Sequence, residues 1–245
     1  MTRIGTFLSG VIMSLVMVFP ATCVQAQTLT TDVAVIGAGG SGMTAALAAA
    51  EGGAKVIVFE AKPIAGGTTN FPMGLFAVES KMQKERNITL TRDEAFTMMM
   101  DYNHYRGNAR LIRAFIDKSA STIEWLQQQG VEFTEPSATS PGMPKTWHLI
   151  KGRGGVMMKA LVAKAKEKGI DIRLNTPVKK IIKEGNRIMG VMAEQDGKPF
   201  QVNAKAVVIA TTMQFADFAD CIPFGESSIT NVSVPVTASF AIAFW

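Results

Sequence analysis

The chain has 245 residues, a formal net charge of +5 and an apolar fraction of 47%. This length and apolar content allow one large or two small packed domains and exclude an intrinsically disordered chain. Lysine and arginine residues are spread from Arg3 to Lys205 instead of gathering in one stretch, which argues against a nucleic-acid-binding protein. The excess positive charge favours attraction of anionic substrates.

The first 26 residues have the pattern of a signal peptide for general secretion. Arg3 supplies the positive charge, residues 10–19 form a short apolar segment, and Val24-Gln25-Ala26 is an acceptable cleavage site. The apolar segment is too short for a membrane-spanning helix, so we expect cleavage, a periplasmic protein and no stable membrane anchor. Cys221 is the one cysteine that would remain, so an internal disulfide is excluded.

The next stretch predicts a strand–helix–strand unit. Val33–Gly37 and Lys55–Phe59 are short, β-branched apolar runs, as expected for buried strands. Between them, about Gly40 to Glu51 is rich in alanine and is followed by a glycine pair, which predicts a helix with a glycine C-terminus.

The turn between the first strand and the helix has G-x-G-x-x-G spacing, at Gly37, Gly39 and Gly42. These glycines permit a tight turn, close approach of a pyrophosphate, and close packing of the helix on the strand. The helix N-terminus then offers N–H groups and its positive dipole end to phosphates. Glu60 ends the second strand, near the position roughly 20 residues after the glycines where an acid binds ribose hydroxyls. Its charge argues against NADP.

A second glycine-rich loop, Gly66-Gly67-Thr68-Thr69-Asn70, follows this acid. The glycine pair lets the backbone pass close to a ligand, and the polar side chains can bond to phosphate or a flavin ring. Nicotinamide-binding Rossmann domains do not require such a loop, whereas two-dinucleotide flavin folds do. An ordinary surface loop is the alternative interpretation.

Two helices are predicted in the middle of the chain. Thr91 and Glu94 form a capping-box pattern before a helix that ends near Tyr102. Asn108 can cap a longer helix whose apolar residues recur every three or four positions until Gly130.

A polar stretch, Thr134–Lys145, predicts a loop that leads into a further glycine turn and a helix, Val156–Lys168. An aromatic residue, a histidine and an arginine lie just before the glycine pair of this turn and could line a ligand pocket. They are Trp147, His148 and Arg153. His148 is therefore a candidate substrate contact, with a structural histidine as the alternative.

The residues from Gly169 to Thr211 are predicted to form strands. Asp196-Gly197 is a strong hairpin signal within a small antiparallel meander. An apolar, parallel-type strand ending in Ala210-Thr211 follows the meander. The predicted short strands are Ile170–Leu174, Val178–Ile182, Arg187–Ala193 and Phe200–Val202.

This order of elements resembles the two-dinucleotide FAD fold. More closely, it resembles the soluble fumarate reductase/succinate dehydrogenase flavoprotein family, which includes flavocytochrome c fumarate reductases, urocanate reductase-like enzymes and ketosteroid dehydrogenases. The resemblance covers about Leu29 to Thr211 and implies an α/β FAD-binding domain with a β-meander and a helical insertion. It also implies reduction of an activated C=C bond of a carboxylate, and a periplasmic electron donor such as a c-type cytochrome.

The resemblance further implies that FAD is held without a covalent bond, since the loop after Glu60 contains no histidine. Within that implied site, Val178 would pair its backbone with adenine, and Gly74 would lie near the flavin ring. The residues expected at FAD are Gly37, Ala38, Gly39, Gly42, Glu60, Lys62, Gly66, Gly67, Thr68, Thr69, Asn70, Gly74, Gly154, Val178, Ala210 and Thr211.

The chain departs from the family after Thr211. Family members usually have Ala-Thr-Gly-Gly where this chain has Ala210-Thr211-Thr212-Met213, and no lysine or arginine follows Lys205. We therefore expect residues 212–245 to be a frameshifted or truncated end, without the family's capping domain and catalytic residues. The alternatives are an inactive FAD-binding fragment and an NAD-binding dehydrogenase, against which the glycine pair and the meander argue. No metal site is predicted.

Overall fold

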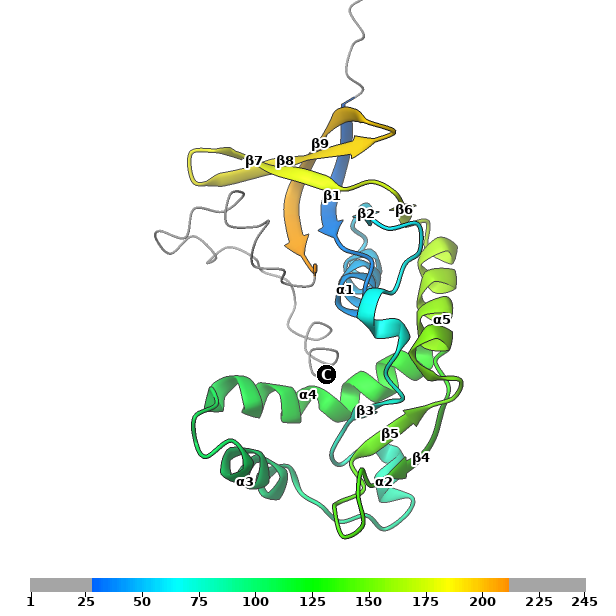
Figure 1. Ribbon diagram of the computed structural model, residues 1–245, viewed down its shortest axis with the longest axis vertical. Coiled ribbons are helices and arrows are strands. Elements are labelled where there is room, and N and C mark those ends of the chain that lie inside the picture. The colour runs from blue at the N-terminus through cyan, green and yellow to red at the C-terminus, as the bar shows by residue number, and fades with distance from the viewer. Residues whose placement is uncertain (1–27, 212–245) are drawn as a thin grey trace, which may run out of the picture.

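The computed structural model describes residues 28–211, and the expectations for residues 1–26 and 212–245 lie outside this range (Figure 1). The described part is an α/β fold built on a six-stranded sheet, in the order β6-β2-β1-β9-β8-β7. This confirms the predicted fold class. The strands of the sheet are β1 (Leu29–Ile36), β2 (Val56–Phe59), β6 (Asp171–Arg173), β7 (Val178–Glu184), β8 (Arg187–Gln195) and β9 (Lys198–Ile209).

The centre of this sheet is parallel and buried on both faces. β1 pairs in parallel with β2 and β9, and β2 pairs in parallel with β6. Val35 and Val58 point to one face, whereas Ala34, Ile36 and Phe59 point to the other, as alternation along strands requires. Apolar side chains on both faces explain why these strands are nearly continuous hydrophobic runs in the sequence.

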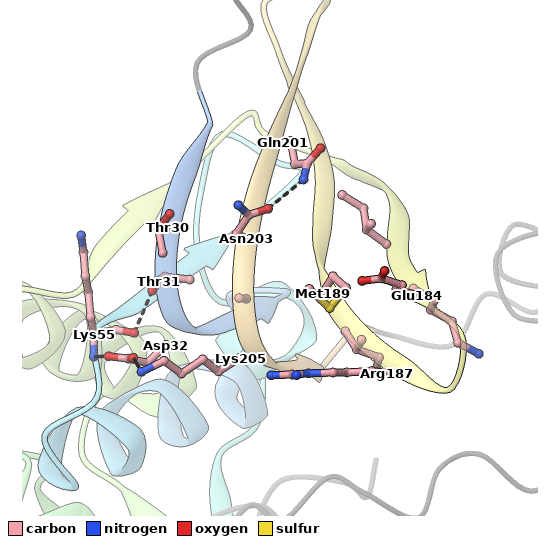
Figure 2. A pocket seen from close by; sticks show the side chains of 14 residues that line it. Thr30, Thr31, Asp32, Lys55, Glu184, Arg187, Met189, Gln201, Asn203 and Lys205 are labelled. Atoms are coloured by element: carbon pink, nitrogen blue, oxygen red, sulfur yellow. Dashed lines mark hydrogen bonds and ion pairs between the residues drawn. The ribbon is translucent and has the colours of Figure 1, made fainter.

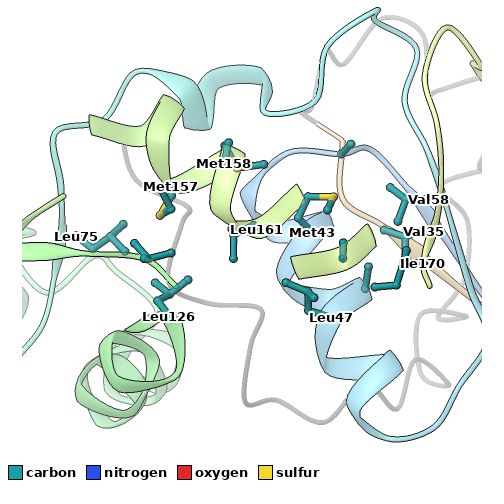
Figure 3. Packing of buried hydrophobic residues seen from close by; sticks show 14 of the residues in the cluster. Val35, Met43, Leu47, Val58, Leu75, Leu126, Met157, Met158, Leu161 and Ile170 are labelled. Carbon is teal, nitrogen blue, oxygen red and sulfur yellow. The ribbon is translucent and has the colours of Figure 1, made fainter. Parts of the chain in front are cut away.

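Two helices, α1 (Gly40–Glu51) and α5 (Arg153–Glu167), pack together over the first face. Figure 3 shows Met43 and Leu47 of α1 between the sheet and Leu161 of α5. The prediction for α1 is confirmed at both ends. α5 begins three residues before the predicted Val156, because Gly152 takes a left-handed conformation and starts the helix directly.

The meander and the parallel sheet share one strand, which the sequence analysis divided into two. The predicted strand Phe200–Val202 and the following apolar strand form the single strand β9. Its first half pairs with β8 up to the Gly190–Asn203 pair, and its second half pairs with β1. Within residues 28–211, the stretch 204–209 pairs with β1 alone. The Asp196-Gly197 hairpin turn is confirmed, and both residues have positive φ angles.

A second, three-stranded antiparallel sheet has the order β3-β5-β4. Its strands are β3 (Gly74–Phe76), β4 (Phe133–Ser137) and β5 (Trp147–Ile150). The predicted loop over Thr134–Lys145 is wrong in its first part, which belongs to β4. These strands are short, and β3 pairs with a strand about 70 residues away, so a local pattern carries little information about them.

The predicted helical insertion consists of α3 (Arg92–Tyr102) and α4 (Ala109–Gln128), with the short helix α2 (Lys81–Lys84) before them. The predicted caps are confirmed. Thr91 and Glu94 form a capping box, and Asn108 Oδ1 accepts a hydrogen bond from the Leu111 N–H at 3.1 Å. No helix among the described residues is long and apolar enough to cross a membrane.

Candidate cofactor site

Three chain segments meet where the parallel strands end. The Gly37 N–H donates to the Phe59 carbonyl at 2.7 Å, and the Ala210 N–H donates to the Ile36 carbonyl at 2.8 Å. The Glu60 N–H donates to the Arg173 carbonyl at 2.8 Å. These bonds hold the glycine turn, the acid and the end of β9 together at the carboxyl edge of the sheet, where open α/β sheets bind ligands.

Two glycines of the turn have no room for a side chain, and a third has open space beside it. Gly37 has a φ of +103°, and a Cβ there would lie 2.7 Å from the Ala210 carbonyl oxygen. A Cβ at Gly42 would lie 1.9 Å from the Gly37 oxygen. A Cβ at Gly39 would meet just the Gly66 oxygen, at 3.8 Å, and would otherwise stand in open space. Gly39 is therefore the position where a ligand can approach the backbone.

The N-terminus of α1 is suited to an anion. Its N-cap residue, Gly39, has no side chain to cap the helix, and no acidic residue lies in the first turn. Gly37, Gly39 and Ser41 are partly exposed, whereas Ala38 and the other glycines of the turn are buried. The positive end of the α1 dipole thus lies beside the open position at Gly39.

Glu60 lies beside this turn with its carboxylate fixed. Oε2 accepts from the Ala38 N–H and Oε1 from the Lys62 N–H, both at 2.9 Å. A carboxylate oxygen can accept more than one hydrogen bond, so both oxygens can still accept from hydroxyl groups. The Thr176 N–H donates to the Glu60 carbonyl at 2.8 Å, which brings the start of β7, with Val178, near this acid.

The second glycine loop packs against the first. The Gly66 N–H donates to the Ala38 carbonyl at 2.8 Å, and a short 3-10 helix, η1 (Gly67–Asn70), follows. Thr69 is 7% exposed, and its Oγ1 accepts from the Gly40 N–H at 3.0 Å. Gly67 and Thr68 are exposed, so these two predicted FAD residues can meet a ligand freely.

His148 does not face an open site. It is fully buried in β5, where Nε2 lies 2.7 Å from Ser80 Oγ and Nδ1 lies 3.2 Å from the Thr146 carbonyl oxygen. Burial lowers the pKa of His148, which favours the neutral imidazole. With both ring nitrogens bonded inside the protein, the geometry fits the structural alternative better than a substrate contact.

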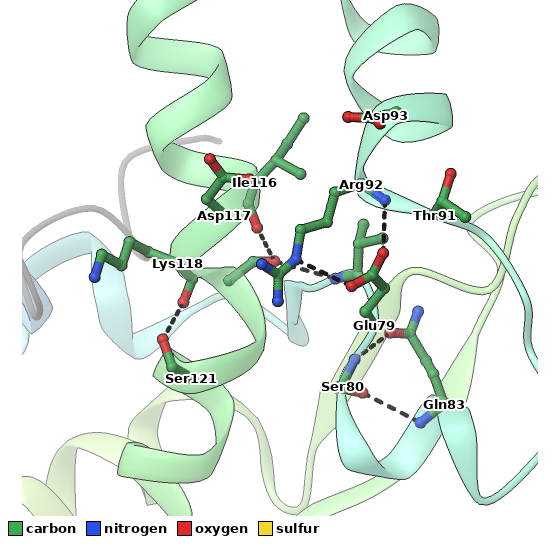
Figure 4. Close-up of polar contacts among 12 residues, drawn as sticks. Glu79, Ser80, Gln83, Thr91, Arg92, Asp93, Ile116, Asp117, Lys118 and Ser121 are labelled. Atoms are coloured by element: carbon green, nitrogen blue, oxygen red, sulfur yellow. Dashed lines mark hydrogen bonds and ion pairs between the residues drawn. The ribbon is translucent and has the colours of Figure 1, made fainter.

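The segment around Ser80 is a polar cluster that the sequence analysis missed (Figure 4). Glu79 has a φ of +58° and its carboxylate accepts from the Arg92 N–H at 3.0 Å, with Arg92 Nε 3.2 Å from the other oxygen. Ser80 and Gln83 form a capping box at α2. The S-x-x-Q spacing is the signal that could have located this helix start.

The comparisons with known proteins decide the family. A family model described as an FAD binding domain matches residues 32–240. The chain belongs to this family. FAD is therefore its cofactor, and the resemblance to fumarate reductase and succinate dehydrogenase flavoproteins is confirmed.

Relatives of this FAD-binding domain are oxidoreductases. The chain is 36% identical to a vinyl phenol reductase of Lactiplantibacillus plantarum over 184 residues, covering 74% of this chain and 37% of that protein. It is 28% identical to a fumarate reductase (cytochrome) of Shewanella frigidimarina, covering 74% and 33% of the two chains. The structure of the open conformation of a flavocytochrome c3 fumarate reductase matches with a TM-score of 0.68 and 28% identity. That match covers 75% of this chain and 34% of the other. The chain thus spans about a third of these relatives.

The geometry of the FAD-binding domain fits its cofactor. The open position at Gly39 and the positive end of the α1 dipole suit a pyrophosphate, and the fixed carboxylate of Glu60 suits the hydroxyls of a ribose. Among the described residues, no group of three or more His, Cys, Asp or Glu side chains could hold a metal ion.

A separate hollow of about 830 Å³ lies at the opposite end of the sheet, between β9 and the β7–β8 hairpin (Figure 2). Asp32 forms an ion pair there with Lys205 at 2.7 Å and accepts from the Lys55 N–H at 2.8 Å. These bonds, chiefly the one from Lys205, lower the pKa of Asp32. None of the predicted FAD residues lines this hollow.

Proposed function

We propose that this chain forms the cofactor-binding part of a reductase that adds hydrogen across an activated C=C bond of a small unsaturated substrate. Its relatives are named as reductases of vinyl phenols and of fumarate, whose C=C bonds are conjugated to an electron-withdrawing or aromatic group. A carboxylate substrate such as fumarate also suits the net charge of +5. When bound, FAD supplies the redox chemistry of this reaction, hydride transfer from its N5 atom.

The residues that we propose to hold FAD lie along the carboxyl edge of the sheet. The glycine turn and the first turn of α1 bind the pyrophosphate, and Glu60 accepts the ribose hydroxyls. The loop from Gly66 to Gly74 lies along the pyrophosphate and the flavin, and Val178 meets the adenine. Ala210 and Thr211 close the site where β9 ends.

One observation carries this proposal. The open position above Gly39 lies at a helix start whose N-cap residue has no side chain, beside a carboxylate whose two oxygens are held by the Ala38 and Lys62 N–H groups. A phosphate-binding turn beside a ribose-binding acid fits a dinucleotide such as FAD, and the names of the relatives supply the reductase reaction.

A turnover assay tests the proposal. The chain is loaded with FAD and mixed with a reduced viologen dye, and dye oxidation is followed with fumarate, with 4-vinylphenol and without substrate. Dye oxidation that depends on one of the two substrates, and that is lost in Gly39→Val because the valine side chain would fill the space for the pyrophosphate, would support the reductase proposal. Because that space is open, the FAD-free variant should unfold at the temperature of the parent chain.

Flavin absorption bands without substrate-dependent oxidation would contradict the reductase proposal. They would support a second candidate, an FAD-binding module that does not turn over by itself, which is favoured by the full burial of His148, the candidate substrate contact. Bound flavin with oxidation in Gly39→Val equal to the parent would instead contradict the proposed cofactor position.

We further propose that the protein is exported through residues 1–26 and receives electrons from a periplasmic donor such as a c-type cytochrome. Residues 1–26 have the pattern of a signal peptide, and one relative is named a fumarate reductase (cytochrome). N-terminal sequencing of protein recovered from the periplasm should begin at Gln27. An intact Met1 would contradict export by cleavage.

A further inference from the structure

The short helix η1 lies between the N-termini of two longer helices, α1 and α5. Figure 1 shows this cyan segment beside both of them. On one side, Thr69 Oγ1 accepts a buried hydrogen bond from the Gly40 N–H of α1 at 3.0 Å. On the other side, the Thr69 carbonyl oxygen faces Gly154 of α5 so closely that a Cβ there would lie 2.0 Å from it.

Gly154 also fixes the chain that follows η1. Its N–H donates to the Pro72 carbonyl at 2.8 Å, and a Cβ at Gly154 would lie 3.0 Å from Pro72 Cδ. Just before α5, at the end of β5, the Ile150 N–H donates to the Met73 carbonyl at 2.8 Å. The start of α5 therefore holds the backbone of the loop from Thr69 to Met73 in one place.

Neither Gly154 nor the hydroxyl of Thr69 points to the open side of the site. Gly154 is buried, and Thr69 is 7% exposed with its hydroxyl bonded to α1. Gly154 of α5 thus contacts Thr69, and Thr69 in turn bonds to the first turn of α1. A shift of α5 would thus displace the helix start that we propose for the pyrophosphate.

We propose that Gly154 and Thr69 position the FAD site and do not contact the cofactor. Gly154 sets the distance between η1 and α5, and Thr69 ties η1 to Gly40. Both residues were predicted from the family resemblance to lie at FAD, so this assignment changes their role. The inference rests on the cofactor site proposed above.

The first experiment adds a methyl group at Gly154 and, as a matched control, at its neighbour Gly155. A Cβ at Gly155 meets the Asn70 oxygen at 3.6 Å, an ordinary contact. The FAD dissociation constant of each full-length variant is measured by flavin fluorescence. We expect Gly154→Ala to bind FAD at least tenfold more weakly than the parent, and Gly155→Ala to stay within twofold. Binding by Gly154→Ala within twofold of the parent, or an equal loss in both variants, would overturn the proposal.

The second experiment adds no atoms and serves if Gly154→Ala does not fold. Thr69→Val removes the hydroxyl acceptor at nearly constant volume, and Thr69→Ser retains it. We expect Thr69→Val to weaken FAD binding at least tenfold and Thr69→Ser to restore it to within threefold of the parent. Equal binding by the valine and serine variants would overturn the role of Thr69.

The double variant tests whether Gly154 acts on FAD binding through Thr69. If Gly154 acts through Thr69, the loss in Gly154→Ala/Thr69→Val is much smaller than the product of the two single losses. A loss equal to that product means independent effects and contradicts the proposal. Absence of FAD binding by the parent chain would contradict the proposed cofactor site itself. Normal FAD binding by both the parent and Gly154→Ala would contradict only the positioning role of Gly154.

Discussion

At the scale of single residues, His148 is held neutral inside the second sheet. Its Nδ1 lies 3.2 Å from a carbonyl oxygen, which requires a proton on that nitrogen, so Ser80 donates its hydroxyl hydrogen to Nε2. Protonation of Nε2 would break this arrangement and place a charge in a fully buried position. Protonation of His148 should therefore destabilise the folded chain around β5, the strand that precedes α5.

This linkage predicts a pH dependence of stability. Because burial lowers the pKa of His148 below 6.5, the unfolded chain binds this proton more readily than the folded one. The free energy of unfolding should therefore fall as the pH drops below about 6.5, by about 1.4 kcal/mol per pH unit at most. Urea unfolding at pH 7 and pH 5 should show a smaller fall in His148→Gln than in the parent. Equal falls in both would contradict the prediction, and His104→Gln, at an exposed site, serves as the control.

At the scale of elements, the two predicted helix caps are local interactions and form as expected. Asn108 lies directly before α4 and bonds to an N–H three residues ahead. Within residues 28–211, α4 contributes Ile116 and Ile123 to the buried core, so its start affects how the insertion packs on the rest of the fold. A cap of this kind stabilises a protein by about 1 kcal/mol.

Asn108→Ala should lower the free energy of unfolding by about 1 kcal/mol, because the Leu111 N–H loses its acceptor. Gln128→Ala, at the exposed opposite end of α4, should change it by less than about 0.5 kcal/mol. Urea titrations of both variants measure the difference. Equal destabilisation by the two substitutions would show that the cap does not contribute.

The elements also show what a single sequence can and cannot predict. The glycine turn, the caps and the Asp196-Gly197 hairpin depend on neighbours a few residues apart, and all are found where predicted. The strand pair Leu75–His148 joins residues far apart in the chain, and no local pattern indicates it. The burial of His148 follows from that distant pairing, so the local pattern around His148 suggested a ligand contact and could not show that the side chain is enclosed.

At the scale of the whole molecule, the parallel strands, both core helices and the loop between them converge on one edge of the sheet. The glycine turn, Glu60 and the end of β9 lie together there through backbone hydrogen bonds. The two helices α1 and α5 share one apolar cluster, so the positions of their N-termini are linked by the core as well as by η1. One FAD should therefore occupy this edge.

Calorimetric titration of the chain with FAD, NAD and NADP tests this requirement most directly. We predict one FAD bound per chain, no saturable binding of NAD or NADP, and loss of FAD binding in Gly39→Val. Glu124→Gln removes a charge from the exposed face of α4 and should bind FAD as the parent does. Binding of NAD without FAD, or FAD binding by Gly39→Val equal to the parent, would contradict the account.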